Sequence, residues 1–163
     1  MSRRRFVLFA LVLSPALGAQ AAPPNMALAE YLARKNELTA AYVSLRAACN
    51  ALWLNGREIC LAEAMAKDVV AKADLEVAYR STPKTRYEAL QARAEAAFWV
   101  AREHCGAVAP ALRAGCVQDA KAVEMAARAD AKVRMKASEA KIIADEDSAM
   151  ARERSRQTAP RLR

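Results

Sequence analysis

The chain has 163 residues, a formal net charge of +8, and alanine at about a quarter of its positions. Three arginines lie among the first five residues, and residues 152–163 hold five arginines against one glutamate, so the body between these ends is nearly neutral. A nearly neutral body argues against a specific nucleic-acid site, because such a site concentrates Lys and Arg along one face.

The N-terminus has the three-part pattern of a signal peptide. Arg3–Arg5 give a positive start, residues 6–17 are largely apolar, and Ala19-Gln20-Ala21 is a small-x-small cleavage site. The apolar run is shorter than the roughly 20 residues that cross a bilayer. We therefore predict a signal peptide over residues 1–21, a periplasmic location, and no transmembrane segment after cleavage.

Two further features concern the export route. No cysteine follows the apolar run before Cys49, which argues against lipid attachment. The start Ser2-Arg3-Arg4-Arg5-Phe6-Val7 also resembles a twin-arginine signal, although the usual polar lead-in is absent. Ordinary secretion is the first choice, and the pattern leaves both routes open.

The mature part of the chain has the composition of a helical protein. Alanine is the strongest helix former, and apolar residues at helical intervals predict helices over about residues 26–48, 59–79, 83–105 and 115–150. Thr82 and Pro83 are the expected cap and first residue of the third helix. The fourth helix, at roughly 36 residues, exceeds the others in length, so its end should project or fray.

The four cysteines indicate an internal duplication. A shift of 56 positions places Cys49 on Cys105 and Cys60 on Cys116, and it also aligns arginines and an aspartate. In a continuous helix the two cysteines of one copy would be roughly 16 Å apart, whereas a disulfide needs Cα atoms within about 7 Å. Pairing within a copy therefore requires the chain to reverse between the cysteines.

Sequence alone allows three connectivities of four cysteines. We favour Cys49–Cys60 and Cys105–Cys116, because duplication of a self-contained unit preserves local pairing. Turn-forming residues lie between the cysteines of each copy. In the first copy these are Asn50 and Leu54-Asn55-Gly56, and in the second they are Gly106, Pro110 and Gly115.

The predicted fold class is therefore all-α. We expect two tandem disulfide-stapled helical hairpins, at residues 22–82 and 83–151, whose four helices pack as an elongated bundle with a long last helix. Residues 152–163 are predicted to be a basic, disordered tail, because they are polar and terminal. The tail would give at most weak contact with an anionic surface, through Arg152, Arg154, Arg156, Arg161 and Arg163.

Candidate catalytic chemistry is scarce. His104 is the only histidine and precedes Cys105, so a nucleophile–histidine pair would have to use a residue beside a predicted disulfide. Only four glycines are present, which leaves little room for a phosphate-binding loop. We predict that the protein is not an enzyme and has neither a cofactor nor a metal site.

Metal binding by His104 and the cysteines is the alternative for this cluster. Zinc sites usually carry ligands at C-x(2–4)-C spacing, which is absent, and an oxidising compartment favours disulfides. A metal site of this kind would require free thiols in the exported protein.

Several segments carry a family resemblance: Tyr42–Cys49, Leu54–Ala64 and Thr82-Pro83-Lys84. They resemble a group of uncharacterised alanine-rich exported proteins of β-proteobacteria with two Cys-x10-Cys units, sometimes labelled TolA-like or cell-envelope protein. The likeness covers about residues 40–136. Ala107-Val108-Ala109-Pro110 departs from the group's polar loop, so the second hairpin tip is expected to differ in shape. The resemblance implies no active residues.

These observations favour a non-enzymatic periplasmic protein that serves protein–protein interaction or structural support of the envelope. The alternative is a periplasmic stress chaperone or scavenger of the small helical type. Chaperones of that type carry a Leu-Thr-x-x-Gln signature. This chain does not match it, because Leu38-Thr39 is followed by Tyr42 at the position of the glutamine.

Overall fold

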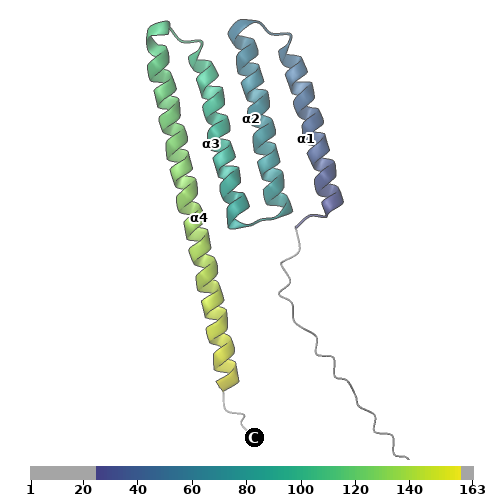
Figure 1. The fold of residues 1–163 in the computed structure, drawn as a ribbon, viewed down its shortest axis with the longest axis vertical. Helices are drawn as coiled ribbons and strands as arrows, with labels where there is room; N and C mark the ends of the chain where they lie inside the picture. Colours follow the sequence, from purple (N-terminus) through teal and green to yellow (C-terminus); the bar gives the residue numbers. More distant parts are fainter. Residues whose placement is uncertain (1–24, 159–163) are drawn as a thin grey trace, which may run out of the picture.

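The computed structural model describes residues 25–158, and these residues contain helices and no strands (Figure 1). The elements are α1 (Leu28–Cys49), α2 (Leu54–Tyr79), α3 (Pro83–Cys105), the short 3-10 helix η1 (Pro110–Leu112) and α4 (Arg113–Thr158). The predicted all-α class, with four helices and a long last one, is confirmed. The expected signal peptide, together with Arg161 and Arg163, lies outside the described residues.

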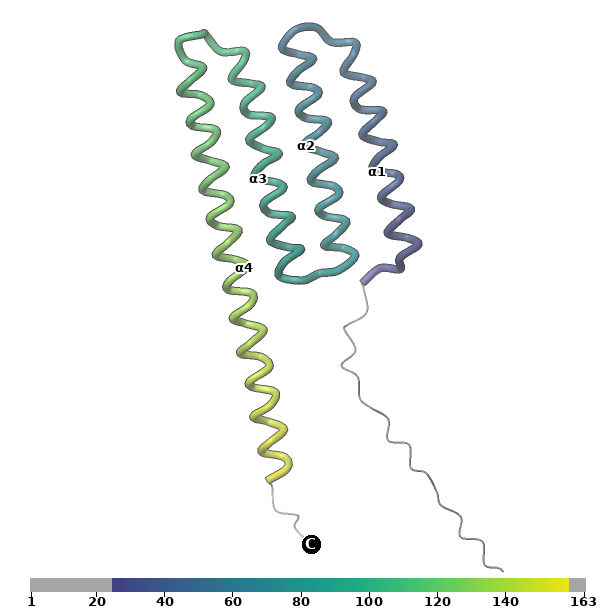
Figure 2. Tube along the Cα trace, viewed as in Figure 1, coloured from purple at the N-terminus to yellow at the C-terminus, as the bar shows by residue number. Residues whose placement is uncertain are grey.

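The four helices lie side by side, in chain order, as a layer one helix thick (Figures 1 and 2). Each helix packs against its neighbours in the chain, and α2 packs against α3 at least as extensively as the helices within either hairpin. Within residues 25–158, α1 and α4 do not contact each other. The elongated bundle therefore has the form of an open layer, with α1 and α4 as its two edges.

The buried core of this layer is thin. Its hydrophobic members are six alanines, two cysteines, one tyrosine and one leucine: Ala62, Ala64, Ala89, Ala94, Ala96, Ala131, Cys49, Cys105, Tyr31 and Leu75. Alanine lets helices approach closely, but each alanine removes little apolar area from water. The stability of the fold must therefore depend strongly on specific contacts and bonds between the helices, in addition to the burial of apolar surface.

One such link fastens the N-terminal end of α1 to the C-terminal end of α2. The Tyr31 ring stacks on Tyr79 with centroids 4.4 Å apart, and the Tyr31 hydroxyl donates a hydrogen bond to Glu76. This hydrogen bond, together with burial, raises the pKa of Tyr31. The backbone N–H of Asn25 also donates to the Tyr79 carbonyl at 2.9 Å. The hairpin of α1 and α2 is therefore held at both ends, by these contacts at one end and by the Cys49–Cys60 disulfide at the other.

The structure corrects one helix boundary and confirms another. Helix α2 begins at Leu54 rather than near residue 59, because the chain reverses over residues 50–53 and Asn55 and Gly56 already belong to the first helical turn. Helix α3 begins as predicted: the Thr82 hydroxyl accepts from the Thr85 N–H at 3.1 Å, and Pro83 is the first helical residue.

The predicted disordered tail is also corrected. Helix α4 continues to Thr158, so residues 152–158 are helical. Alanine, arginine and glutamate favour helix, and neighbouring side chains interact at helical spacing, as in Lys141–Asp145 at 2.9 Å and Gln157–Glu153 at 3.2 Å. Every residue from Glu139 to Thr158 is exposed, and α4 projects well past the end of α3 (Figure 2).

Candidate functional site

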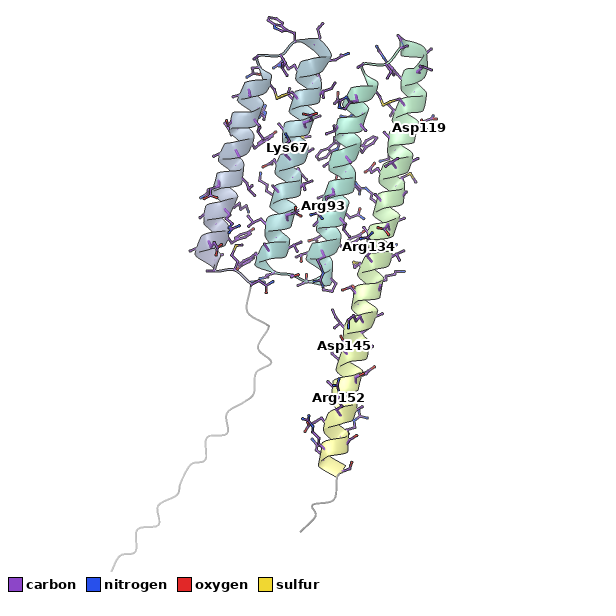
Figure 3. The ribbon with its side chains drawn as sticks, turned by 180° about the vertical axis from the view of Figure 1, so that it is seen from behind. Lys67, Arg93, Asp119, Arg134, Asp145 and Arg152 are labelled. Atoms are coloured by element: carbon purple, nitrogen blue, oxygen red, sulfur yellow. A yellow bond between two sulfur atoms is a disulfide. The ribbon has the colours of Figure 1, made fainter. Side chains whose placement is uncertain are left out.

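Two disulfides hold the layer at one end. Cys49 pairs with Cys60, with Cα atoms 5.6 Å apart, and Cys105 pairs with Cys116, with Cα atoms 5.7 Å apart. The predicted connectivity is therefore confirmed. Each bridge joins the last residue of one helix to the beginning of the next, and both bridges lie at the end of the layer where the hairpins turn (Figure 3).

The two hairpin turns at this end are linked to each other. The Asn55 side-chain amide donates to the Gly106 carbonyl at 3.4 Å, which connects the first turn to the second. Within each turn an arginine supports the loop: Arg57 donates to the Asn50 side chain at 3.5 Å, and Arg113 donates to the Val108 carbonyl at 3.2 Å. The two turns therefore form one continuous end of the molecule.

This end exposes large apolar side chains. We name them the tip cluster: Leu52, Trp53, Leu54 and Leu112. Trp53 is 86% exposed and Leu54 is 88% exposed, the highest values among the large apolar residues described. Leu54 also has a positive φ of 50°, the only such non-glycine residue in the described chain. A leucine in this conformation is strained by roughly 1–2 kcal/mol.

This strain gives a prediction. Leu54→Gly should raise the free energy of unfolding by about 0.5–1 kcal/mol, because glycine adopts positive φ without strain, although it gains entropy when unfolded. Leu112→Gly is the matched control: this exposed residue of η1 has no positive φ, so the substitution should destabilise. Urea unfolding measures both variants. Destabilisation by Leu54→Gly would show that the position is not strained.

A shallow groove runs between α2 and α3 on one face of the layer. It encloses about 780 Å³, and alanines and valines form most of its floor. Lys67, Asp74, Arg93 and His104 are the polar residues that line it, and Asp74 forms an ion pair with Arg93 across the two helices. Figure 3 shows Lys67 and Arg93 near the middle of the layer. A groove of this composition is suited to an apolar ligand or helix with polar flanks.

Helix α4 carries a buried carboxylate, and one of the partners of this carboxylate links α4 to α3. Glu124 is 3% exposed and accepts hydrogen bonds from Lys121 at 2.6 Å and Arg128 at 2.8 Å. Arg128 also donates to the Gln91 side chain of α3 at 3.1 Å. The hydrogen bond from Lys121 is the largest cause of a lowered Glu124 pKa, and the bond from Arg128 adds to it against the effect of burial.

The lowered pKa predicts acid-dependent stability. A group with a depressed folded-state pKa stabilises the fold above its unfolded pKa, near 4.5, and that contribution is lost as the pH falls through the folded-state value. Glu124→Gln should therefore cost about 1 kcal/mol at pH 7, because the partners are themselves half-exposed, and less below pH 4. Urea unfolding of both proteins at pH 7 and pH 3.5 tests this. An equal difference at both values would contradict it.

The disulfides use the cysteines that a metal site with His104 would need as free thiols. All four cysteines are in disulfides, so His104 has no neighbouring thiolate. Within residues 25–158 there is no group of three or more His, Cys, Asp or Glu side chains placed to hold a metal ion. His104 lies instead at the rim of the α2–α3 groove.

Sequence reasoning missed the tip cluster. Residues 52–54 fall between the first two predicted helices, and the sequence predicts no functional role for them. The signal was present as three consecutive large apolar residues between two paired cysteines. Large apolar residues that are exposed side by side commonly mark an interaction site.

No helix in the described part of the chain combines the length and the apolar character needed to cross a membrane. Comparison with protein-family models, with characterised proteins and with solved structures found no match for this chain.

Proposed function

We propose that this protein is a non-enzymatic protein of the periplasm that binds a protein partner, or supports envelope structure, through its open helix layer. One observation carries the proposal: the layer is one helix thick, so its edges and faces remain uncovered. Exposed large apolar side chains that gather on a surface commonly mark interaction sites.

The exposed apolar residues follow the helix edges. On α1, Leu28, Leu32 and Val43 are exposed at intervals that place them along one stripe of the helix. On α4, exposed residues include Val123, Val133 and Ile142. Helices at the edge of a layer expose such residues because no further helix covers them, and a partner helix would bury them.

The α2–α3 groove is the most specific part of this surface. Its apolar floor suits the apolar face of a helix, and the charges of Lys67, Asp74 and Arg93 at its rim would fix the orientation of that helix. Both signs of charge are present, so the groove favours a partner with mixed polar flanks rather than a polyanion.

A periplasmic location is supported by two features. The N-terminal pattern is that of a signal peptide. Two structural disulfides also suit an oxidising compartment, since intracellular thiols are usually kept reduced.

Site-specific photocrosslinking in intact cells tests the proposal. A photoreactive residue at Ala97, on the groove floor, should give one discrete adduct, whereas the same residue at Ala129, an exposed position of α4 outside the groove, should not. Ala97→Glu should abolish the adduct formed from a second groove position, Val70, while leaving thermal unfolding unchanged, because residue 97 is exposed. The absence of any adduct from Ala97 and Val70 would overturn the groove as a partner site.

A stress chaperone is the second candidate, since apolar surface spread over two edges also suits unfolded clients of variable shape. The chaperone hypothesis predicts that this protein, added in an amount equimolar with a chemically unfolded client, slows the aggregation of that client. Ala97→Glu would then have little effect, because no single groove carries the binding. A specific partner predicts the opposite pattern.

A further inference from the structure

We propose that the tip cluster docks onto a lipid bilayer that carries anionic headgroups, so that the helix layer stands with its hairpin turns at the membrane surface. This inference goes beyond the proposed partner binding and does not depend on it. It rests on three features of one end of the molecule: exposed large apolar side chains, a constrained loop that carries them, and a net positive charge beside them.

Two large apolar residues of this end are almost fully exposed. The protein builds its core mainly from alanine, yet it carries Trp53 and Leu54 where the first turn meets α2, and there they are 86% and 88% exposed. Tryptophan is enriched at membrane–water interfaces, where its ring lies among the headgroups while its N–H stays hydrated, and an adjacent leucine can enter the acyl region.

The loop that carries these residues is constrained at several points. The Cys49–Cys60 bridge closes the turn covalently, and the Asn55–Gly106 hydrogen bond holds the second turn beside it. Leu54 keeps a strained positive φ at a position that glycine would occupy without strain. Strain retained in a constrained, exposed loop is typical of functional positions, and a preorganised loop loses less entropy on binding.

The helical turns next to this end carry a net positive charge. Four arginines lie in the helical turns next to this end, against two glutamates: Arg46, Arg57, Arg102 and Arg113, with Glu58 and Glu103. Arg102 is paired with Glu103 at 2.9 Å. Arg57 and Arg113 occupy equivalent positions of the two repeats, so each turn carries one arginine close behind its apolar residues. Guanidinium groups next to the apolar residues would bind the phosphate oxygens of anionic headgroups.

The order of these groups favours a bilayer over a protein pocket. In each turn an arginine follows the exposed apolar residues along the chain, Arg57 after Leu54 and Arg113 after Leu112, and a bilayer offers acyl chains and phosphates to these two kinds of side chain. Two separate turns that share this order suit an extended surface better than one pocket. The far end of α4, which carries Arg152, lies at the opposite end of the molecule (Figures 1 and 3). The faces of the layer would stay open to a protein partner.

The experiment uses the mature full-length protein with Trp99→Phe, so that Trp53 is the only tryptophan. Vesicles of phosphatidylethanolamine and phosphatidylglycerol, and vesicles of phosphatidylcholine alone, are added while the emission of Trp53 is recorded. We expect a shift to shorter wavelength and quenching by acyl-brominated lipid, both stronger with the anionic vesicles. Sedimentation with the same vesicles gives the partition coefficient.

Two variants make the test specific. Trp53→Ser with Leu54→Asn should lower the partition coefficient at least about tenfold, since burial of one such side chain is worth that factor. Asparagine tolerates positive φ, so thermal unfolding should not fall. Leu28→Ser with Leu32→Ser removes two exposed apolar residues from the opposite end of α1 and should leave partitioning unchanged.

Arg57→Gln with Arg113→Gln should weaken the preference for anionic vesicles, and because glutamine keeps a donor for the Asn50 side chain and the Val108 carbonyl, thermal unfolding should not fall. Unchanged Trp53 emission with every vesicle, or equal partitioning of the tip variant, would overturn the proposal. A protein adduct from a photoreactive residue at position 53, without vesicle binding, would overturn it in favour of a protein pocket. The crosslink from the α2–α3 groove reports partner binding separately, so failure of one proposal is distinguishable from failure of the other.

Discussion

Removal of either disulfide will lower the free energy of unfolding by roughly 2 to 3 kcal/mol, the value expected on the chain-entropy model for a loop of this length. Each bridge joins residues 11 positions apart. This loss is a large share of the total free energy of unfolding, because the core between the helices consists mainly of alanines. Removal of both bridges is expected to leave a marginally stable or unfolded chain.

The variants are Cys49→Ala with Cys60→Ala, and Cys105→Ala with Cys116→Ala. Alanine is preferable to serine here because Cys49 and Cys105 are almost fully buried, so a hydroxyl would need a partner. Urea unfolding is measured with and without reductant. Reductant should destabilise the wild type and each single-bridge variant, and it should have no effect when both pairs are replaced. Wild-type stability that is insensitive to complete reduction would contradict the account.

Ala131→Leu will destabilise the second hairpin by about 1–3 kcal/mol. Ala131 is 1% exposed and lies on the side of α4 that packs against α3. Three added heavy atoms would force the two helices apart or push side chains out of their preferred rotamers. The same substitution in a loosely packed interface would instead be tolerated.

Ala129→Leu is the matched control, two residues earlier on the same helix and exposed. It makes the same change in helix propensity without entering the interface, so its effect should stay within about 0.5 kcal/mol. Thermal and urea unfolding of the two variants separate packing from propensity. Equal effects would show that α3 and α4 are not in close contact at Ala131.

The sequence predicted the parts of the fold that depend on local chemistry. The Cys-x10-Cys repeat favoured pairing within each copy, because duplication of a self-contained unit preserves local pairing, and such a bridge requires the chain to reverse between the cysteines. Thr82 and Pro83 predicted the start of α3, because cap and proline chemistry act within one turn. These features are determined within a few residues.

The open arrangement of the helices was harder to predict. Small alanine-rich stripes can face more than one neighbour, so the sequence does not specify whether α1 returns to contact α4. The boundary of α2 was misplaced because Asn55-Gly56 usually forms a turn, whereas here the reversal is complete before Asn55. The helical end of α4 was missed because terminal, charged segments were expected to be disordered, while pairs such as Lys141–Asp145 support the helix.

The tip cluster became a candidate site only once the disulfides were placed. Leu52-Trp53-Leu54 would be ordinary core residues in another fold, and only the position of the closed turn at the end of the layer leaves them exposed. Exposure of this kind is a tertiary property. Local propensity therefore does not predict it.

We expect that the chain is exported and that it forms two independently closed helical hairpins. The most direct test is the intact mass of the protein recovered from the periplasm, with and without alkylation under denaturing conditions, followed by peptide mapping of its bridges. We predict a mature protein beginning at Ala22, four hydrogens lighter than the reduced chain, with Cys49–Cys60 and Cys105–Cys116 peptides. Four alkylated thiols, or bridges that connect the two repeats, would contradict the account.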